Sequence, residues 1–325
     1  MYKNLTLFAA IAVFAACAFG QTATGILQGR VTDPTGAAVA DSSVIIENQR
    51  TGVKQTLKTN GEGLFVQTFL IPSEYQVTVE KPGFQKSQTR DVRIDVQKTV
   101  ELDIALKVGE VGTTVEVSAS TVQLSTSTSS VSTVINRQAM LDLPLNGRSP
   151  FNLAVLTPGV TGSGANPSIS GGRGGTNEIT VDGTTVVVPE NNVSTNDLGY
   201  QPIVDSVEEF SVITNALSAE YGRTGGGVIN VATRAGSNTF HGSLFEFVRN
   251  EKLDANSWGN NRNGARKNPL RRNQFGGSIG GPISIPHVYS GKNRTFFFFS
   301  EQETILHQFS SSNATVPTAA WRAGD

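Results

Sequence analysis

The 325-residue chain has a formal net charge of −1, and 16% of its residues are charged. This balance excludes a strongly basic protein, so the charge gives no reason to expect nucleic acid as the main partner. Glycine is frequent, with 34 residues, and long amphipathic helical patterns are nearly absent. We therefore expect a mainly β chain that is long enough for two or three domains.

The first twenty residues have the pattern of an export signal. Lys3 supplies a positive charge, residues 5–19 are apolar and uncharged, and small residues precede Gln21. The apolar run is shorter than the ~20 residues of a membrane-spanning helix. We expect a signal peptide over residues 1–20. Its removal would take away Cys17, the only cysteine, and with it any disulfide, thiolate chemistry or cysteine zinc site.

Residues 25–107 contain about seven short alternating strands separated by turns, which predicts a β-sandwich. Within this unit Asn60-Gly61 is a strong hairpin signal. The unit resembles carboxypeptidase regulatory-like, transthyretin-type domains. The matching residues are Gly29, Val31, Asp33, Gly36, Thr59, Gly61, Gly63, Phe65, Pro72, Tyr75, Gly83 and Phe84.

The family name suggests a peptidase. The resemblance, however, implies a domain that accompanies peptidases without carrying their chemistry. The three histidines, His241, His287 and His307, have no partner at a metal-binding spacing. We therefore expect no enzymatic activity, no catalytic residue, no metal site and no cofactor.

Residues 108–130 change character and end in a run of serine and threonine. Such a segment is too polar to build a core, and we interpret it as a linker.

Residues 207–234, VEEFSVITNALSAEYGRTGGGVINVATR, predict a strand, a turn and a second strand. In the first strand Phe210 and Val212 alternate with polar residues, which is typical of a half-buried strand. The turn contains residues 225–227, all glycine, which tolerate positive φ and close backbone approach. The pattern by itself predicts an ordinary β-hairpin.

The ordered string is more specific, because it resembles the end of the plug domain of TonB-dependent outer-membrane receptors. The matching residues are Tyr221, Gly222, Gly226, Gly227, Val228, Ile229, Asn230, Thr233 and Arg234. Upstream, a glycine and arginine turn, a strand and an aspartate-glycine turn follow the order of such a plug. These residues are Gly171, Gly172, Arg173, Asn177, Asp182 and Gly183. We expect a mixed α+β plug over residues 131–235.

Two short helices are expected inside this plug. Asn136 is a helix cap for residues up to Leu141, and Pro150 opens a second helix as its first residue. Leu153 and Leu156 of the second helix are predicted core residues.

The same resemblance draws attention to residues 113–119, which look like a TonB box. Such an extended segment adds a strand to a sheet edge of TonB. The alternative is that the segment is only the last strand of the sandwich, and the sequence leaves both open. Its residues are Thr113, Thr114, Val115, Glu116, Val117, Ser118 and Ala119.

Residues 236–325 predict the start of an outer-membrane β-barrel, with aromatic-rich strand-like segments between polar stretches. The run Phe296–Phe299 suits a strand with one face in lipid, and the alternative is a buried strand of a soluble sheet. Ninety residues supply roughly four of the ~22 strands of a plugged transporter barrel. We therefore expect the chain to be the N-terminal piece of a longer receptor.

This last segment contains two further patterns. Residues 276–280 satisfy G-x-S-x-G, but Pro282 blocks the helix that a nucleophile elbow requires. A basic cluster would meet lipopolysaccharide phosphates if it lies in an outward loop of a barrel, and its alternative is a solvated loop. The cluster is Arg262, Arg266, Lys267, Arg271 and Arg272.

The expected fold is therefore mainly β: a transthyretin-like or Ig-like β-sandwich, a mixed α+β plug, and the first strands of an incomplete transmembrane β-barrel. The resemblance implies an Oar-like TonB-dependent receptor in the outer membrane of a Gram-negative-type bacterium, with the sandwich in the periplasm. Its partners would be a TonB-like energy-coupling protein, the outer membrane with its lipopolysaccharide, and an unidentified extracellular ligand. Two other interpretations are a secreted or surface adhesin that binds carbohydrate and a non-catalytic accessory module of a peptidase.

Overall fold

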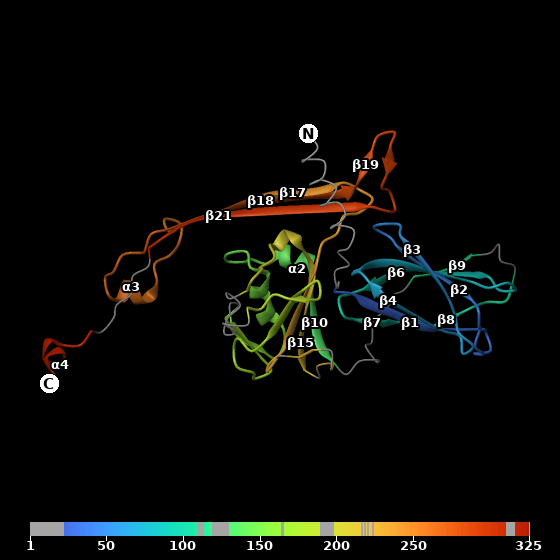
Figure 1. Ribbon diagram of the computed structural model, residues 1–325, viewed down its shortest axis with the longest axis horizontal. Coiled ribbons are helices and arrows are strands. Elements are labelled where there is room, and N and C mark those ends of the chain that lie inside the picture. Colours follow the sequence, from blue (N-terminus) through green and yellow to red (C-terminus); the bar gives the residue numbers. More distant parts are fainter. Residues whose placement is uncertain are drawn as a thin grey trace, which may run out of the picture. The chain divides into compact units, whose positions relative to one another are not determined.

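The structure is a computed structural model in which the described residues fall into two compact units. One unit contains Met1–His241 and Gly280–Phe299, and the other contains Gly242–Ile279 and Ser300–Asp325. The signal peptide predicted over residues 1–20 and most of the linker lie outside the described residues. The described residues are 23–109, 114–118, 130–163, 166–188, 198–215, 217, 219, 221, 222, 224–309 and 316–324 (Figure 1).

Residues 23–109 and 114–118 form a β-sandwich of two sheets, called the sandwich below (Figure 1, blue and cyan). The first sheet has the order β4-β1-β7, with β8 also paired to β1, and the second has the order β3-β2-β5-β6-β9. The strands are β1 (Gly25–Thr32), β2 (Ser43–Asn48), β3 (Lys54–Lys58), β4 (Leu64–Leu70), β5 (Ser73–Glu80), β6 (Lys86–Ile94), β7 (Thr99–Glu101), β8 (Ile104–Ala105) and β9 (Thr114–Ser118).

Alternating apolar residues hold the two sheets together. In β1 and β2 every second residue is buried, and Leu27, Ile46 and Val77 are at most 1% exposed in one shared core. Gly29 permits a close approach of the chain, since a Cβ there would lie 1.9 Å from the carbonyl oxygen of Leu102. The mainly β structure predicted for this part of the chain is therefore confirmed.

The hairpin predicted at Asn60-Gly61 is wrong. Strand β3 pairs with β2 and β4 pairs with β1, so this turn carries the chain from one sheet to the other. The Asn60 side chain accepts hydrogen bonds from the backbone N–H groups of Glu62 (3.0 Å) and Leu64 (2.8 Å). The local signal thus marks a turn, whereas strand pairing is decided by which faces carry the apolar residues.

The described part of residues 130–235 forms the central domain, built on a five-stranded sheet (Figure 1, green to yellow). Its order is β10-β15-β16-β13-β14, in which β15 and β16 form the predicted antiparallel hairpin and β13 runs parallel to β16. The strands are β10 (Val131–Asn136), β13 (Glu178–Val181), β14 (Thr184–Thr185), β15 (Val207–Asn215) and β16 (Val228–Thr233), with a separate hairpin of β11 (Val160–Ser163) and β12 (Asn166–Ile169).

Short helices pack beside this sheet: α2 (Arg137–Asp142), the 3-10 helix η1 (Pro150–Leu156) and the 3-10 turn η4 (Val204–Ser206). Asn136 caps α2 as predicted, because its side chain accepts a hydrogen bond from the N–H of Ala139 at 3.0 Å. Leu153 is a core residue as predicted. The prediction for Leu156 is wrong, since this last residue of η1 is 59% exposed where the chain leaves the helix.

Three long strands follow, in the order β17-β18-β21 (Figure 1, orange to red). They are β17 (His241–Asn250), β18 (Leu270–Pro282) and β21 (Phe296–Gln308). The same segment also contains a hairpin of β19 (Ser284–Ile285) and β20 (Tyr289–Ser290). Its two short helices are α3 (Trp258–Arg262) and α4 (Ala319–Ala323). The described strands do not form a closed barrel. We expected about four barrel strands in this segment, and three long strands are described.

This last sheet leaves apolar side chains exposed. Leu244 is 93% exposed, Ile279 is 50% exposed and Phe299 is 59% exposed. Residues 276–280 lie inside β18, so the chain does not turn from strand into helix at the G-x-S-x-G pattern. Among the described residues, no helix is long and apolar enough to cross a membrane.

Candidate functional site

The central hairpin is buried on both of its faces, which corrects the expectation of half-buried strands. Phe210 and Val212 lie in the core of the central domain. On the opposite face Glu209 is 0% exposed and Ser211 is 1% exposed. Sandwich residues reach this polar face, and the burial of a carboxylate there requires partners that the alternation pattern does not reveal.

The glycines of the two predicted plug turns are brought together. A Cβ at Gly172 would lie 2.7 Å from the Cα of Gly226, and one at Gly227 would lie 2.4 Å from Ile169 Cγ2. Asn177 bridges the two turns, because its side chain accepts a hydrogen bond from the N–H of Gly227 (3.1 Å) and donates one to the carbonyl of Pro167 (2.7 Å). These glycines are therefore required by close packing.

Two other members of the predicted turns have local roles. The Asp182 carboxylate accepts hydrogen bonds from the N–H (2.9 Å) and the hydroxyl (2.6 Å) of Thr233. Asp182 and Gly183 both have positive φ, 49° and 82°. The turn of β13 and β14 is thereby fixed to the end of β16. Arg173 contributes its carbonyl, which accepts from the N–H of Thr176 at 3.2 Å.

Tyr221 and Asn230, two polar residues of the plug motif, contact the sandwich. The Asn230 amide donates hydrogen bonds to the side-chain oxygen of Gln97 and, at 3.5 Å, to the Tyr221 hydroxyl. The Gln97 amide also donates to the Tyr221 hydroxyl. Gln97 lies in the turn between β6 and β7, and no sequence pattern marks it as a contact residue. The motif therefore holds a sandwich turn against the central sheet.

Glu209 is the second contact between these parts. Its carboxylate accepts hydrogen bonds from Arg93 Nη2 at 2.7 Å and from the N–H of Val96. Arg93 also pairs with Asp95 at 2.8 Å. Burial, with a further contribution from the charge of Asp95, raises the pKa of Glu209 to about 7, although Val96 and Arg93 act in the opposite direction.

We expect the stability of the chain to fall as the pH rises through about 7. Because the pKa of Glu209 is higher in the folded than in the unfolded state, the folded state binds more protons between pH ~4.5 and ~7. The stabilisation is complete below this window and is lost above it. The loss should be about 1 to 3 kcal/mol in the free energy of unfolding, measured by urea titration at pH 5 and pH 8.

The substitution Glu209→Gln should abolish this difference, because the amide keeps a hydrogen-bond acceptor and does not titrate. Glu74→Gln, at an exposed position, is the matched control and should keep the dependence of the parent chain. An unchanged pH dependence in Glu209→Gln would assign the effect to another group.

A buried ionic cluster lies in the same sheet region. Asp205 is 2% exposed and accepts a hydrogen bond from Arg148, which is 9% exposed. Arg137 Nη2 lies 3.8 Å from the other carboxylate oxygen of Asp205. Burial lowers the pKa of Arg148, and the charge of Asp205 opposes this shift. The cluster ties the helix region to the start of β15.

The predicted TonB-box segment is partly described. Residues 114–118 form β9, which pairs in parallel with residues 86–90 of β6 at the end of a sandwich sheet. Thr113 and Ala119 lie outside the described residues. The segment therefore occupies the position of a last sandwich strand, and its use as a TonB box stays a prediction.

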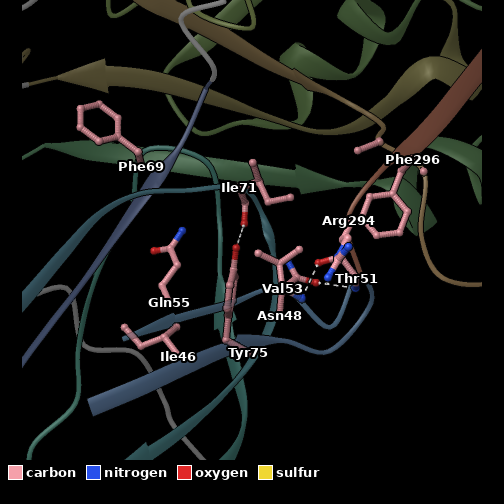
Figure 2. A pocket seen from close by; sticks show the side chains of 12 residues that line it. Ile46, Asn48, Thr51, Val53, Gln55, Phe69, Ile71, Tyr75, Arg294 and Phe296 are labelled. Carbon is pink, nitrogen blue, oxygen red and sulfur yellow. Dashed lines mark hydrogen bonds between the residues drawn. The ribbon is translucent and has the colours of Figure 1, made fainter. Parts of the chain in front are cut away.

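A cavity of about 250 Å³ lies beside the sandwich (Figure 2). Its wall includes Phe69, Ile71 and Tyr75, and the Tyr75 hydroxyl donates a hydrogen bond to the carbonyl of Ile71 at 2.8 Å. Arg294 and the side chain of Gln55 add polar groups. The lining is mainly apolar and contains no arrangement of nucleophile and base.

The basic cluster of residues 262–272 has local partners. Lys267 Nζ donates hydrogen bonds to the carbonyls of Glu251 (2.6 Å) and Asp254 (2.8 Å). The Arg262 guanidinium lies 5.2 Å from the centre of the Trp258 ring. In the described parts of the chain, no three histidine, cysteine or acidic residues are grouped so that they would hold a metal ion.

Two family models match separate parts of the chain. Residues 26–107 match the carboxypeptidase regulatory-like domain, and residues 232–325 match an outer membrane beta barrel domain. Over 284 residues, the chain is 29% identical to the TonB-dependent transporter Oar of Myxococcus xanthus. The chain is therefore Oar-like: over most of its length it is similar to a TonB-dependent transporter. The aligned part is 83% of this chain and 26% of that transporter, so the chain spans about a quarter of the relative's length.

Solved structures resemble smaller parts of the chain. Hydroxyquinol 1,2-dioxygenase from Pseudomonas putida is 8% identical, with 28% of this chain and 59% of that chain covered at a TM-score of 0.24. The minor pilin GBS52 of Streptococcus agalactiae is 20% identical, with 27% and 46% covered at a TM-score of 0.23. TM-scores of this size do not establish a shared fold, and the dioxygenase chemistry does not bear on this chain.

Proposed function

We propose that the chain forms the sandwich, the plug and the first barrel strands of an outer-membrane transporter that takes up an unidentified ligand with energy from TonB. The central domain is the plug, and the exported sandwich lies in the periplasm. The observation that carries the proposal is the central hairpin, in which the motif glycines permit backbone contact and the motif amide and hydroxyl bind a neighbouring turn.

The work of such a protein is gating, and no residue carries covalent chemistry. The plug needs a fold that is stable by itself and attached to its surroundings by contacts that can be broken. The central domain has its own apolar core, whereas Glu209 and Asn230 bind the sandwich through polar groups. Polar contacts exchange with water at a small net cost, about 1 kcal/mol for a typical hydrogen bond.

The TonB-like partner would bind residues 113–119 as an added strand. Strand β9 lies at the end of its sheet, so a competing sheet edge has only one pairing to replace. The basic cluster is proposed to face lipopolysaccharide, although Lys267 also binds carbonyl groups of its own loop.

The proposal is tested on the full gene product in cells. We expect the product to stay with the membrane fraction after a high-salt wash, to be released by detergent, and to be retained by an immobilised TonB C-terminal domain. Val115→Pro should lower this retention at least tenfold, because proline removes a donor from the added strand. Proline at Gln123, outside the candidate box, is the matched control.

A freely soluble product would reject the transporter and favour the adhesin or peptidase-module interpretation. A membrane product that binds TonB equally well with Val115→Pro would keep the location and reject this segment as the TonB box. Binding of the soluble sandwich to polysaccharide without any membrane fraction would support the adhesin.

A further inference from the structure

The sandwich contacts the central domain through two of its turns, residues 49–53 between β2 and β3 and residues 95–98 between β6 and β7. In the first turn, the Arg50 guanidinium lies 2.7 Å from the Glu208 carboxylate, whose side chain is 14% exposed. In the second turn, Lys98 Nζ donates a hydrogen bond to the Ser132 hydroxyl at 2.7 Å. The first turn thus reaches β15 of the central hairpin, and the second reaches β10, the strand beside it.

A small apolar cluster seals the second turn. Val96 is 0% exposed and packs with Ala23 and Ala232 in a buried cluster separate from the two domain cores. Ala232 belongs to β16, and Val96 belongs to the sandwich turn. The same turn supplies the N–H that binds Glu209. An apolar contact and a buried carboxylate are therefore side by side.

The first turn also binds the segments that lead into the barrel-type strands. Asn238 donates from its backbone N–H to the Arg50 carbonyl (3.1 Å) and from its amide to the Thr51 carbonyl (2.7 Å). Asn293 accepts a hydrogen bond from the Asn238 amide (2.6 Å) and donates its N–H back to Asn238 (2.8 Å). One turn of the sandwich is thereby bonded both to Glu208 and to the residues just before β17 and β21.

This contact is built to separate without unfolding its two sides. The sandwich and the central domain each have an extended apolar core of their own. What joins them is a cluster of three small side chains and a set of ion pairs and amide hydrogen bonds. Surfaces of this polar kind are typical of domain contacts that open and close.

We propose that the sandwich is a clamp: its turns 49–53 and 95–98 hold the central domain to the first barrel segments and open before the plug moves. The clamp rests on the proposed plug function. It adds to that function a closed state, secured by Arg50 and Arg93 on the sandwich and by Glu208 and Glu209 on the plug.

The test measures how fast a thiol reagent reaches the clamp. Cysteine is placed at Val96 in a chain with Cys17→Ser, and modification by a maleimide reagent is followed over time in detergent. We expect slow labelling, and at least tenfold faster labelling when Arg50→Ala and Arg93→Ala are added. Equal rates in the two chains would overturn the clamp.

A control residue separates clamp opening from unfolding. Val77 lies in the sandwich core and, like Val96, is 0% exposed. Cysteine at this position should stay protected in both chains, since the domain itself remains folded. If its labelling accelerates together with that of Val96, the two arginines stabilise the fold and the clamp is rejected.

A second experiment tests the clamp in cells. In cells that carry the full gene product, labelling of the cysteine at Val96 should be at least tenfold faster with TonB than in cells without TonB. No difference, for a product that is in the membrane and binds TonB, would reject opening of the clamp and leave the proposed function in place. A product that is absent from the membrane would instead reject the proposed function.

Discussion

Alanine at Gly227 is expected to destabilise the central domain by about 2 to 3 kcal/mol, the cost of overpacking a rigid site. The new Cβ would lie 2.4 Å from Ile169 Cγ2 and 2.5 Å from the carbonyl oxygen of Ile213. Ile169 is fully buried, and Ile213 belongs to β15, which is paired to β16 at this point. Neither neighbour can move aside without disturbing the core or the hairpin. Urea titration followed by circular dichroism measures the loss.

Gly222 is the matched control within the same motif. A Cβ at this position meets nothing within 4 Å, and its φ is not in the left-handed region. Gly222→Ala should therefore change the free energy of unfolding by less than about 0.5 kcal/mol. Equal effects at the two glycines would show that close packing is not the reason for the glycines of this motif.

Loss of the Asp205 carboxylate is expected to cost about 3 to 5 kcal/mol, because it leaves a buried guanidinium without its counter-charge. Arg148 is 9% exposed, and Arg137 approaches the same carboxylate at 3.8 Å. Asp205→Ala keeps the backbone turn of η4 and removes only the charge and its hydrogen-bond acceptors. The measurement is the urea midpoint at pH 7, compared with the parent chain.

Asp254→Ala is the control for a surface pair. Its carboxylate is 30% exposed and lies 2.9 Å from Arg249, so its removal should cost at most about 1 kcal/mol. A second variant, Asp205→Ala with Arg148→Met, should recover part of the loss because the buried charge is then removed as well. A small effect of Asp205→Ala alone would mean that water reaches the two arginines.

Much of the local structure could be predicted from the sequence, and the reason is chemical. Alternating apolar residues mark strands such as β1 and β2, and an amide before a helix marks its start, as Asn136 does for α2. The carboxypeptidase regulatory-like domain and the barrel-domain segment were also recognisable, because they depend on ordered residue patterns. The pairing of strands that are not consecutive in the sequence could not be predicted, as the turn at Asn60 demonstrates.

Only one side of the candidate site, the side in the central domain, could be predicted from the sequence. Tyr221 and Asn230 were found because they belong to an ordered motif, but their partner Gln97 carries no pattern of its own. The one available signal was Glu209, a carboxylate next to Phe210 within a strand that is buried along most of its length. Such a position requires a counter-charge if both faces are covered, and the sequence does not say which of many arginines supplies it.

The amino-acid sequence by itself determined the strands, the turns, the glycines of the motif and the likeness to a known family, since these depend on residues that are close together or in a fixed order. Only the tertiary structure decided that both faces of the central hairpin are buried and that Arg93 neutralises Glu209. These two residues are 116 positions apart, and no local preference selects one distant partner over another. Their pairing follows from the packing of two separately folded domains, which places particular side chains in contact.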